Sequence, residues 1–381
     1  MKVKKLAIGA AMLLFVTEAY AESSVTLYGI MDTGIEFYNH AKTGGSVYGM
    51  PALTGELPSR WGLKGVEDLG GGLRAVFNLE SGFAPGTGGL NYGGRLFGRQ
   101  ANVGLGNRFG TVLFGRQSNM TYYSVVNADI LGPALIGLAS FDPYLANARS
   151  DNAIGYMGKF GGVTIGATYS FGRDSATVPG PGGTGCAGQV PGDFQACKQV
   201  TAMVMYDTAN YGASVSFDQM RGGASTDFGP LVSSADKDTH IQATAYYDFS
   251  HGKFAGGWIH HNVNVGRSYH TDLYFLNGTY LPTPFLALDL VGAHFNVSNP
   301  SNIGGVIENG AIVPGSVAPA TSNSTMITAR ATYFVSKRTS VYAMLGYMIN
   351  SRNGAVALTG GGTVQTGANQ TGGMVGIQHK F

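Results

Sequence analysis

Charged residues are scarce in this chain, at 12% of its 381 residues, whereas ordinary soluble domains carry about a quarter. Without its first 21 residues, which hold three lysines and one glutamate, the chain has as many acidic as basic residues. It also has no basic tail and no arginine-rich run. This excludes nucleic acid as a partner. So few charges also make a soluble surface difficult to build.

Long apolar runs are missing too. A membrane-spanning helix needs about 18 or more consecutive apolar residues, and no such stretch follows the start of the chain. A membrane protein built of helices is therefore excluded. The start itself combines three early lysines, an apolar stretch over residues 6–16 and the sequence Ala19-Tyr20-Ala21. This is the pattern of an export signal. We expect residues 1–21 to be a cleaved signal peptide, with an uncleaved anchor as the alternative, and residues 22–381 to form one barrel.

Cysteine is limited to Cys186 and Cys197, which lie close together in a stretch rich in glycine and proline. An exported protein matures in an oxidising compartment, where a local disulfide is expected. Two free thiols and half of a metal site are the alternatives. No set of His and Cys residues at metal-ligand spacing accompanies the pair, and we expect neither a metal nor a cofactor.

The abundant residues are glycine, with 60 copies, and Tyr and Phe, with 20 each. From Val25 onward they alternate at period two in segments of about ten residues, which are separated by short turns and longer polar loops. This pattern is typical of a membrane-spanning barrel. Eight long loops predict a 16-stranded antiparallel transmembrane β-barrel, with short turns in the periplasm and long loops outside the cell. The loops are expected near residues 39–57, 84–94, 118–151, 172–198, 221–238, 264–271, 298–324 and 351–371.

Alternation also assigns the two faces of each strand. Val163, Ile165 and Ala167 alternate with Thr164 and Gly166, so one face is apolar and the other polar. The last strand alternates up to the final residue, Phe381. Because an open edge in lipid would leave backbone groups unpaired, this strand must be paired on both sides. A soluble β-sandwich is the alternative, although it would not need so many strands.

Several segments resemble a known family. They are residues 24–29 (SVTLYG), 59–83, 93–117 and the terminal Phe381, and they look like the general porins of Gram-negative bacteria of the Burkholderia and Neisseria type. The resemblance implies a homotrimer in the outer membrane, in contact with lipid and lipopolysaccharide. It implies insertion by the barrel-assembly machinery through the C-terminal strand, with Phe381 as the signal. It also implies that the third long loop, 118–151, folds into each pore and narrows it.

A pore needs a bore and an arrangement of charge rather than a reacting group. The alternation of side chains along each strand, which we call its parity, directs four residues into the barrel: Arg60, Lys64, Arg74 and Arg330. A position at the barrel rim is the alternative for each. Arg116 is added because it directly precedes the third loop. Its parity, shared with Arg95 and Arg99, points toward lipid, so we expect all three above the apolar belt or beyond a bulge.

The third loop contains an apolar run over residues 130–138 together with Asp129 and Asp142. We expect the run to pack against the inner wall while the two aspartates face the arginines across the pore. The alternative is that the run caps the barrel or meets a neighbouring subunit. Because basic residues outnumber the loop aspartates, a weak preference for anions is expected.

The predicted function is therefore passive diffusion of small hydrophilic solutes and ions across the outer membrane. The alternatives are a substrate-specific channel and a hydrolase built on a barrel. No nucleophile elbow and no paired zinc-protease histidines support the hydrolase.

Overall fold

The computed structural model describes residues 24–174, 186–223, 231–266, 268–298, 305–308, 311–314 and 322–381. The expected signal peptide lies outside these ranges. Sixteen long antiparallel strands form the barrel, as predicted, and three shorter strands lie in its loops. No helix in the described part is long and apolar enough to cross a bilayer. The barrel strands are β1 (Ser24–Tyr38), β3 (Arg60–Gly70), β4 (Leu73–Gly82), β5 (Gln100–Asn107), β6 (Gly110–Ser118), β7 (Arg149–Phe160), β8 (Val163–Ser170), β9 (Gln199–Asp207), β10 (Tyr211–Arg221), β11 (Lys237–Phe249), β12 (Gly252–Asn264), β13 (Ser268–Thr283), β14 (Leu286–Ser298), β17 (Ser324–Phe334), β18 (Thr339–Asn350) and β19 (Gln370–Lys380).

The connections differ in length at the two ends of the barrel. At one end they are tight turns, such as residues 71 and 72, two glycines with positive φ that close the turn between β3 and β4. At the other end most connections are long. One carries β2 (Val47–Gly49), and another carries the hairpin of β15 (Gly305–Glu308) and β16 (Ala311–Pro314). This asymmetry is the one expected for an outer-membrane barrel.

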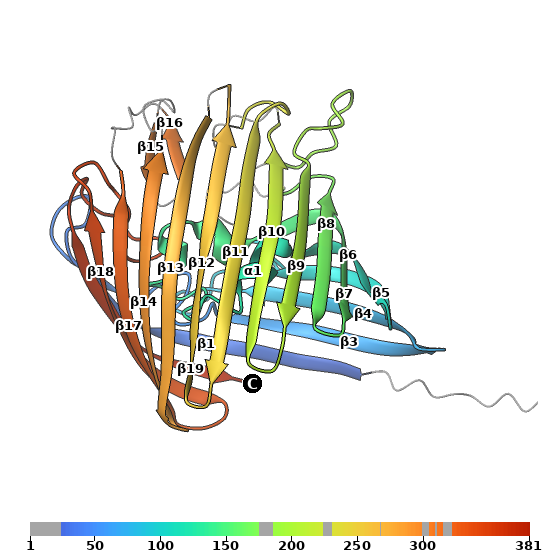
Figure 1. The fold of residues 1–381 in the computed structure, drawn as a ribbon, viewed down its shortest axis with the longest axis horizontal. Helices are drawn as coiled ribbons and strands as arrows, with labels where there is room; N and C mark the ends of the chain where they lie inside the picture. The colour runs from blue at the N-terminus through green and yellow to red at the C-terminus, as the bar shows by residue number, and fades with distance from the viewer. Residues whose placement is uncertain are drawn as a thin grey trace, which may run out of the picture.

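The barrel closes where the first strand meets the last. Residues Ser24 to Ile30 of β1 pair with β3, and residues Ile30 to Tyr38 pair with β19. Beyond the end of β19, Phe381 exchanges two backbone hydrogen bonds with Gly29, of 3.0 and 3.1 Å. Figure 1 shows the C-terminus beside β1 and β19 at the end that carries the short turns. We call this contact of β1, β3 and β19 the closing seam.

The outward face is apolar along the strands. Val204, Leu276 and Leu345 are 57%, 71% and 68% exposed. In β8, Val163 and Ile165 are exposed while Thr164 and Thr168 are buried, which confirms the predicted parity. So large an exposed apolar belt is not compatible with water on that side.

The third long connection folds into the barrel, as predicted. It contains α1 (Met120–Val125), the 3-10 helix η1 (Leu138–Ser140) and α2 (Pro143–Asn147). Figure 1 shows α1 enclosed by the strands, and α1 packs against β8, β9, β10 and β11. The buried core of the molecule therefore lies inside the barrel, between this loop and the wall.

The outward belt gives a direct test of which face meets hydrocarbon. Leu345 lies in the middle of β18, so Leu345→Arg should destabilise the barrel by about 2–4 kcal/mol, the cost of arginine at the bilayer midplane. The same change at Val335, which is 60% exposed in the turn after β17, should cost about 0–1 kcal/mol. Urea unfolding in lipid vesicles measures both. Equal costs at the two positions would show that β18 does not face lipid.

Candidate functional site

The first part of the third loop is held to the wall by hydroxyl groups. Asn119 caps α1 by accepting from the backbone N–H of Thr121. The Thr121 hydroxyl then donates to Asp218 of β10 over 2.7 Å, and the Thr244 hydroxyl of β11 donates to the carbonyl of Ser124 over 2.8 Å. The helix lies close to β8 because Gly166 has no side chain, since a Cβ there would collide with Met120.

The tip of the loop is held from the opposite side. The Leu135 N–H donates to the Gly55 carbonyl, and the Leu135 carbonyl accepts from the Gly360 N–H, both over 2.8 Å. The Asn277 amide on β13 donates to the Ala128 carbonyl over 2.7 Å. Residues from the first and eighth long connections therefore also turn inward. The loop is fastened on both sides of the lumen.

The apolar run packs against the inner wall of β12 to β19, as predicted. Leu131, Leu135, Ile136 and Leu138 are at most 2% exposed. Burying an aliphatic side chain of this size contributes about 1.5–3 kcal/mol, so the run is a major anchor of the loop. Its wall partners include Ile259, Leu273, Phe275, Val291, Phe295, Met326, Met344, Met348 and Met374, and the cluster also contains Val356 and Leu358 of the eighth loop.

Arg330 points into the barrel from β17, as its parity predicts, but its charge is compensated. Its guanidinium lies 2.8 Å from an Asp289 carboxylate oxygen and 3.1 Å from one of Glu56. It also donates to the Ile130 carbonyl over 3.2 Å. Removal from water raises the pKa of Glu56, and the neighbouring Arg330 opposes that rise. Arg330 is therefore an anchor between wall and loop.

A group that we call the arginine cluster lies where β3, β4, β5 and β7 meet the long loops. Its members are Arg60, Arg99, Arg149 and Glu80. The Arg99 Nε lies 2.6 Å from one Glu80 oxygen and the Arg60 Nε lies 3.6 Å from the other. Arg149, only 3% exposed, donates to the Arg99 carbonyl over 2.9 Å. Within the described part of the chain no carboxylate lies within 4.0 Å of Arg149, so the cluster carries more positive than negative charge.

Arg116 lies at the rim beside an irregularity in strand pairing, which is the kind of position that was expected for it. The register of β6 against β7 shifts between Gly115 and Gln117. The Arg116 side chain is buried at the rim, where its Nε donates to the Gly98 carbonyl over 2.7 Å and its guanidinium pairs with Asp151. It therefore braces the loop that precedes β5.

Lys64 and Arg74 are both exposed. Both line a recess of about 630 Å³ between the N-terminal strands and the start of the third loop. The Lys64 ammonium lies 5.3 Å from the centre of the Tyr28 ring. Among the described residues that line this recess, which we call the lumenal recess, there is no Asp or Glu.

The two loop aspartates do not both face arginines, contrary to the prediction. Asp142 caps α2 by accepting from the Tyr144 N–H, and its other oxygen lies 3.0 Å from Nε2 of His240. Asp129 is half-buried and accepts from the Gly132 N–H over 3.1 Å. Asp142 therefore contacts a histidine, and Asp129 contacts the backbone of the loop itself.

The two cysteines lie in the fourth long connection. Cys186 and Cys197 form a disulfide, with their Cα atoms 5.3 Å apart. The Cys197 N–H donates to the Gly222 carbonyl over 2.8 Å. The bridge therefore closes a loop within this connection, and the hydrogen bond ties that loop to the end of β10.

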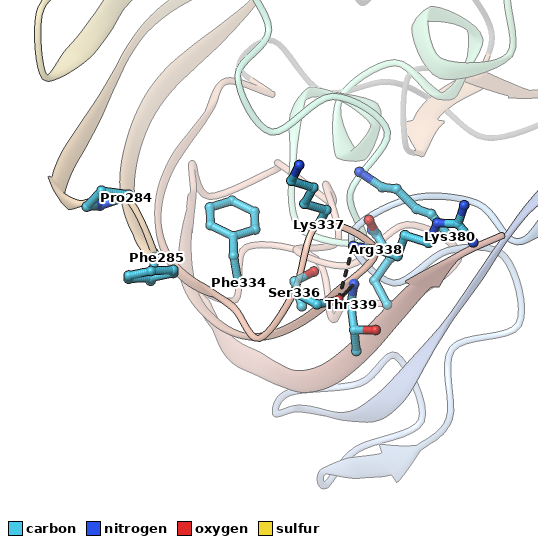
Figure 2. Close-up of a pocket in the computed structure, with 10 residues that line it drawn as sticks. Pro284, Phe285, Phe334, Ser336, Lys337, Arg338, Thr339 and Lys380 are labelled. Carbon is cyan, nitrogen blue, oxygen red and sulfur yellow. Dashed lines mark hydrogen bonds between the residues drawn. The ribbon is translucent and has the colours of Figure 1, made fainter.

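A second group of basic residues lies on one side of the opening at the end with the short turns. Lys337, Arg338 and Lys380 line a pocket of about 480 Å³ together with Phe285 and Phe334. Figure 2 shows the side chains of Lys337 and Lys380 extending to the same side of the turn, with Phe285 at the far edge. No ion pair joins these three cations to a carboxylate in the described ranges. This opening is therefore electropositive.

The chain matches the model of the Gram-negative porin family over residues 9–353. The protein is a Gram-negative porin. It is 29% identical to the outer membrane porin protein 32 of Delftia acidovorans, over 99% of this chain and the whole of that protein. It is 36% identical to the major outer membrane protein P.IB of Neisseria gonorrhoeae over 27% of this chain and 29% of that protein.

Solved structures agree with this assignment. The anion-selective porin from Comamonas acidovorans superposes with a TM-score of 0.73 at 27% identity, covering 94% of this chain and all of that one. OmpF of Salmonella typhi has a TM-score of 0.62 at 15% identity, with 94% and 97% covered, and this shows the fold alone. The porin lies in the outer membrane and belongs to a family of channels, so the hydrolase alternative is discarded.

Sequence reasoning missed several residues of this porin's interior. Glu56 pairs with Arg330, Arg149 joins the arginine cluster through the Arg99 carbonyl, and the stretch 355–358 of the eighth loop is buried against the third. The apolar sequence of residues 355–358 in an otherwise polar loop was the available signal. Glu56 had none, because its position follows from the packing of the first loop.

Asp129 should make the porin less stable as the pH rises. Partial burial in an apolar setting raises the pKa of Asp129 to about 7. An acid whose pKa is higher in the folded state than in the unfolded state lowers the free energy of unfolding when it ionises. This loss of stability is absent below the unfolded pKa of about 3.9 and complete above the folded pKa of about 7. Asp129→Asn should therefore raise the midpoint of denaturant unfolding at pH 8 and leave it unchanged at pH 3.

The matched control for this change is Asp68→Asn. Asp68 is exposed and accepts a similar short-range hydrogen bond, from the Gly70 N–H over 2.8 Å. Its substitution should give the same small shift at both pH values. A pH-independent effect of Asp129→Asn would show that its carboxylate is fully hydrated in the folded porin.

Proposed function

We propose that this porin is a passive channel for small hydrophilic solutes and ions that prefers anions weakly. The observation that carries the proposal is the lumenal recess, whose described lining includes Lys64 and Arg74 and no Asp or Glu. Asp68 lies opposite Arg74 in the register of β3 and β4, but it does not line the recess. An uncompensated positive charge lowers the energy of an anion and raises that of a cation in its vicinity.

The arginine cluster supports the same sign of selectivity. Arg60 and Arg99 pair with Glu80, and Arg149 has no carboxylate within 4.0 Å among the described residues, which leaves a positive excess at the extracellular end of the wall. The cations Lys337, Arg338 and Lys380 add a further excess at the periplasmic mouth. A permeating anion would thus meet favourable potential along its whole path.

Compensated charges keep the preference weak. Arg330 pairs with two carboxylates, and Arg116 pairs with Asp151, so neither contributes a free charge to the bore. The structure from Comamonas acidovorans is itself described as an anion-selective porin. This agrees with the proposed sign.

Neutralising the lumenal recess tests the proposal. The double change Lys64→Ala and Arg74→Ala should shift the reversal potential in a salt gradient toward cations. A unit charge about 8 Å from the permeating ion is worth about 0.5 kcal/mol in water. The anion loses this energy and the cation gains it, so each removed charge should change the anion-to-cation permeability ratio about fivefold. Planar-bilayer recording measures this ratio at low salt, where screening is least.

The control removes one cation outside the recess. Arg108 lies in the exposed turn after β5, where its guanidinium stacks on Phe109. Arg108→Ala should leave the ratio within experimental error. An unchanged reversal potential in the Lys64 and Arg74 variant would overturn the assignment of these residues to the permeation path.

We also propose that the porin is a homotrimer. A solved barrel of the same fold, OmpT of Vibrio cholerae, is described in a trimer form, with a TM-score of 0.63 at 14% identity. The measurement is the mass of the detergent-solubilised protein by light scattering, corrected for bound detergent. A mass of one chain in mild detergent would contradict the trimer.

A further inference from the structure

The pocket of about 480 Å³ at the periplasmic end lies against β17, β18 and β19. Four residues of these strands line it: Phe334, Ser340, Gln378 and Lys380. Ser340 and Gln378 are buried, Lys380 shares the parity of Gln378, and Phe334 shares the parity of Thr332, which is also buried. The pocket, which we call the mouth pocket, therefore opens into the lumen rather than toward lipid. Its volume lies in the range of small-molecule sites, about 300–1,000 Å³.

Two phenylalanines form the apolar side of the mouth pocket. The Phe334 N–H donates to the Phe285 carbonyl over 2.8 Å, so the two residues lie on neighbouring strands. Phe285 shares the inward parity of Ala287, and the two side chains are 59% and 38% exposed for Phe285 and Phe334. In Figure 2 the Phe334 ring and the Lys337 side chain extend to the same side of the chain. Aromatic girdles of outer-membrane barrels face outward, so these inward rings have no part in the girdle.

Three cations form the other side. Lys337 and Arg338 belong to the turn between β17 and β18, and the Lys380 N–H donates to the Arg338 carbonyl over 2.8 Å. The turn is held by the Ser336 hydroxyl, which accepts from the N–H groups of Arg338 and Thr339 over 3.2 and 3.0 Å (Figure 2). A braced turn thus keeps three cationic side chains around one opening.

The carboxylates behind this part of the wall are engaged elsewhere. The Gln378 amide donates to Asp32 over 2.9 Å and to Glu56 over 3.4 Å. Asp32 also accepts from the Tyr342 hydroxyl, and Glu56 pairs with Arg330. Among the residues that the structure describes, no carboxylate lies within 4.0 Å of the three cations of the pocket. Their charge is therefore available to a ligand.

We propose that the mouth pocket binds small organic anions in which a carboxylate is joined to an aromatic ring. The carboxylate would meet the cations, and the planar guanidinium of Arg338 suits both of its oxygens. The ring would pack against Phe285 and Phe334, stacked with an offset or edge to face. An inorganic anion would use only the cationic side, and an uncharged aromatic molecule only the apolar side. The inference rests on the proposed function, because it names one class among the anions that the channel prefers.

The test compares three probes on the purified porin in a planar bilayer. The chloride current is recorded while potassium benzoate, potassium acetate or benzyl alcohol is added. Benzoate should halve the current at a concentration about 2–10-fold lower than acetate, because its ring adds an aromatic contact. It should also act at a lower concentration than benzyl alcohol, which lacks the charge. Equal half-inhibitory concentrations of benzoate and acetate in the wild type would overturn the proposal whether or not any variant folds.

The apolar side is tested by the paired change Phe285→Ala and Phe334→Ala. It should bring the half-inhibitory concentration of benzoate to that of acetate and leave acetate unchanged. The matched control is Tyr333→Ala, because Tyr333 is the next residue of β17 and faces the opposite way. This control should keep the wild-type ratio. An equal loss of the ratio in both variants would contradict the pocket.

The cationic side is tested by the paired change Lys337→Ala and Arg338→Ala. Each removed charge should weaken benzoate and acetate alike by about two- to fivefold, as expected for exposed ion pairs. Lys159→Ala is the control, because Lys159 lies near the short turn after β7 and does not line the pocket. It should leave the benzoate-to-acetate ratio and the benzoate concentration close to wild type. An unchanged benzoate response in the Lys337 and Arg338 variant would remove the cations from the site.

The reversal potential in a KCl gradient, recorded before any probe is added, separates this inference from the proposed function. A porin that prefers cations there but responds more strongly to benzoate than to acetate retains the mouth pocket and loses the proposed selectivity. A porin that prefers anions but responds equally to benzoate and acetate retains the selectivity and loses the pocket.

Discussion

The rest of the structure depends on the pairing of every backbone N–H and C=O group that lies in hydrocarbon. The closing seam satisfies this constraint by dividing β1 between β3 and β19. The same seam organises the interior, because Asp32 on β1 accepts from the backbone of Glu56 and Leu57 and from the Tyr342 hydroxyl. It thereby draws the end of the first loop into the barrel. That segment in turn holds the tip of the third loop at Leu135.

The position of the third loop decides where water passes. Its apolar run covers the wall of β12 to β19, where the inward side chains are aliphatic and aromatic. The opposite wall, from β3 to β7, keeps polar and basic side chains such as Lys64 and Asn102 around the lumenal recess. Hydrophobic burial on one side of the barrel therefore leaves the basic side as the solvent-filled path. The selectivity that we propose follows from this division of the wall.

Alternation along the strands was enough to predict the barrel, its strand number and the inward direction of Arg330, because each of these depends on local parity. It was not enough for Arg116, where a register shift and the loop that carries Gly98 determine the partner. Nor could it predict that Asp142 meets His240, since 98 residues separate them. Ion-pair partners depend on how the loops pack, and one sequence contains no periodic signal for that.

The number of basic and acidic residues is a poor guide to the charge of this porin's interior, because most of those residues form ion pairs with one another. Arg330 lies at mid-strand and was the natural candidate for a free charge in the bore, yet two carboxylates surround it. Arg149 was not considered for the pore, yet it is a buried guanidinium without a carboxylate within 4.0 Å among the described residues. Burial of an unpaired cation is costly, and the proximity of the Tyr92 ring at 5.2 Å offsets only part of that cost.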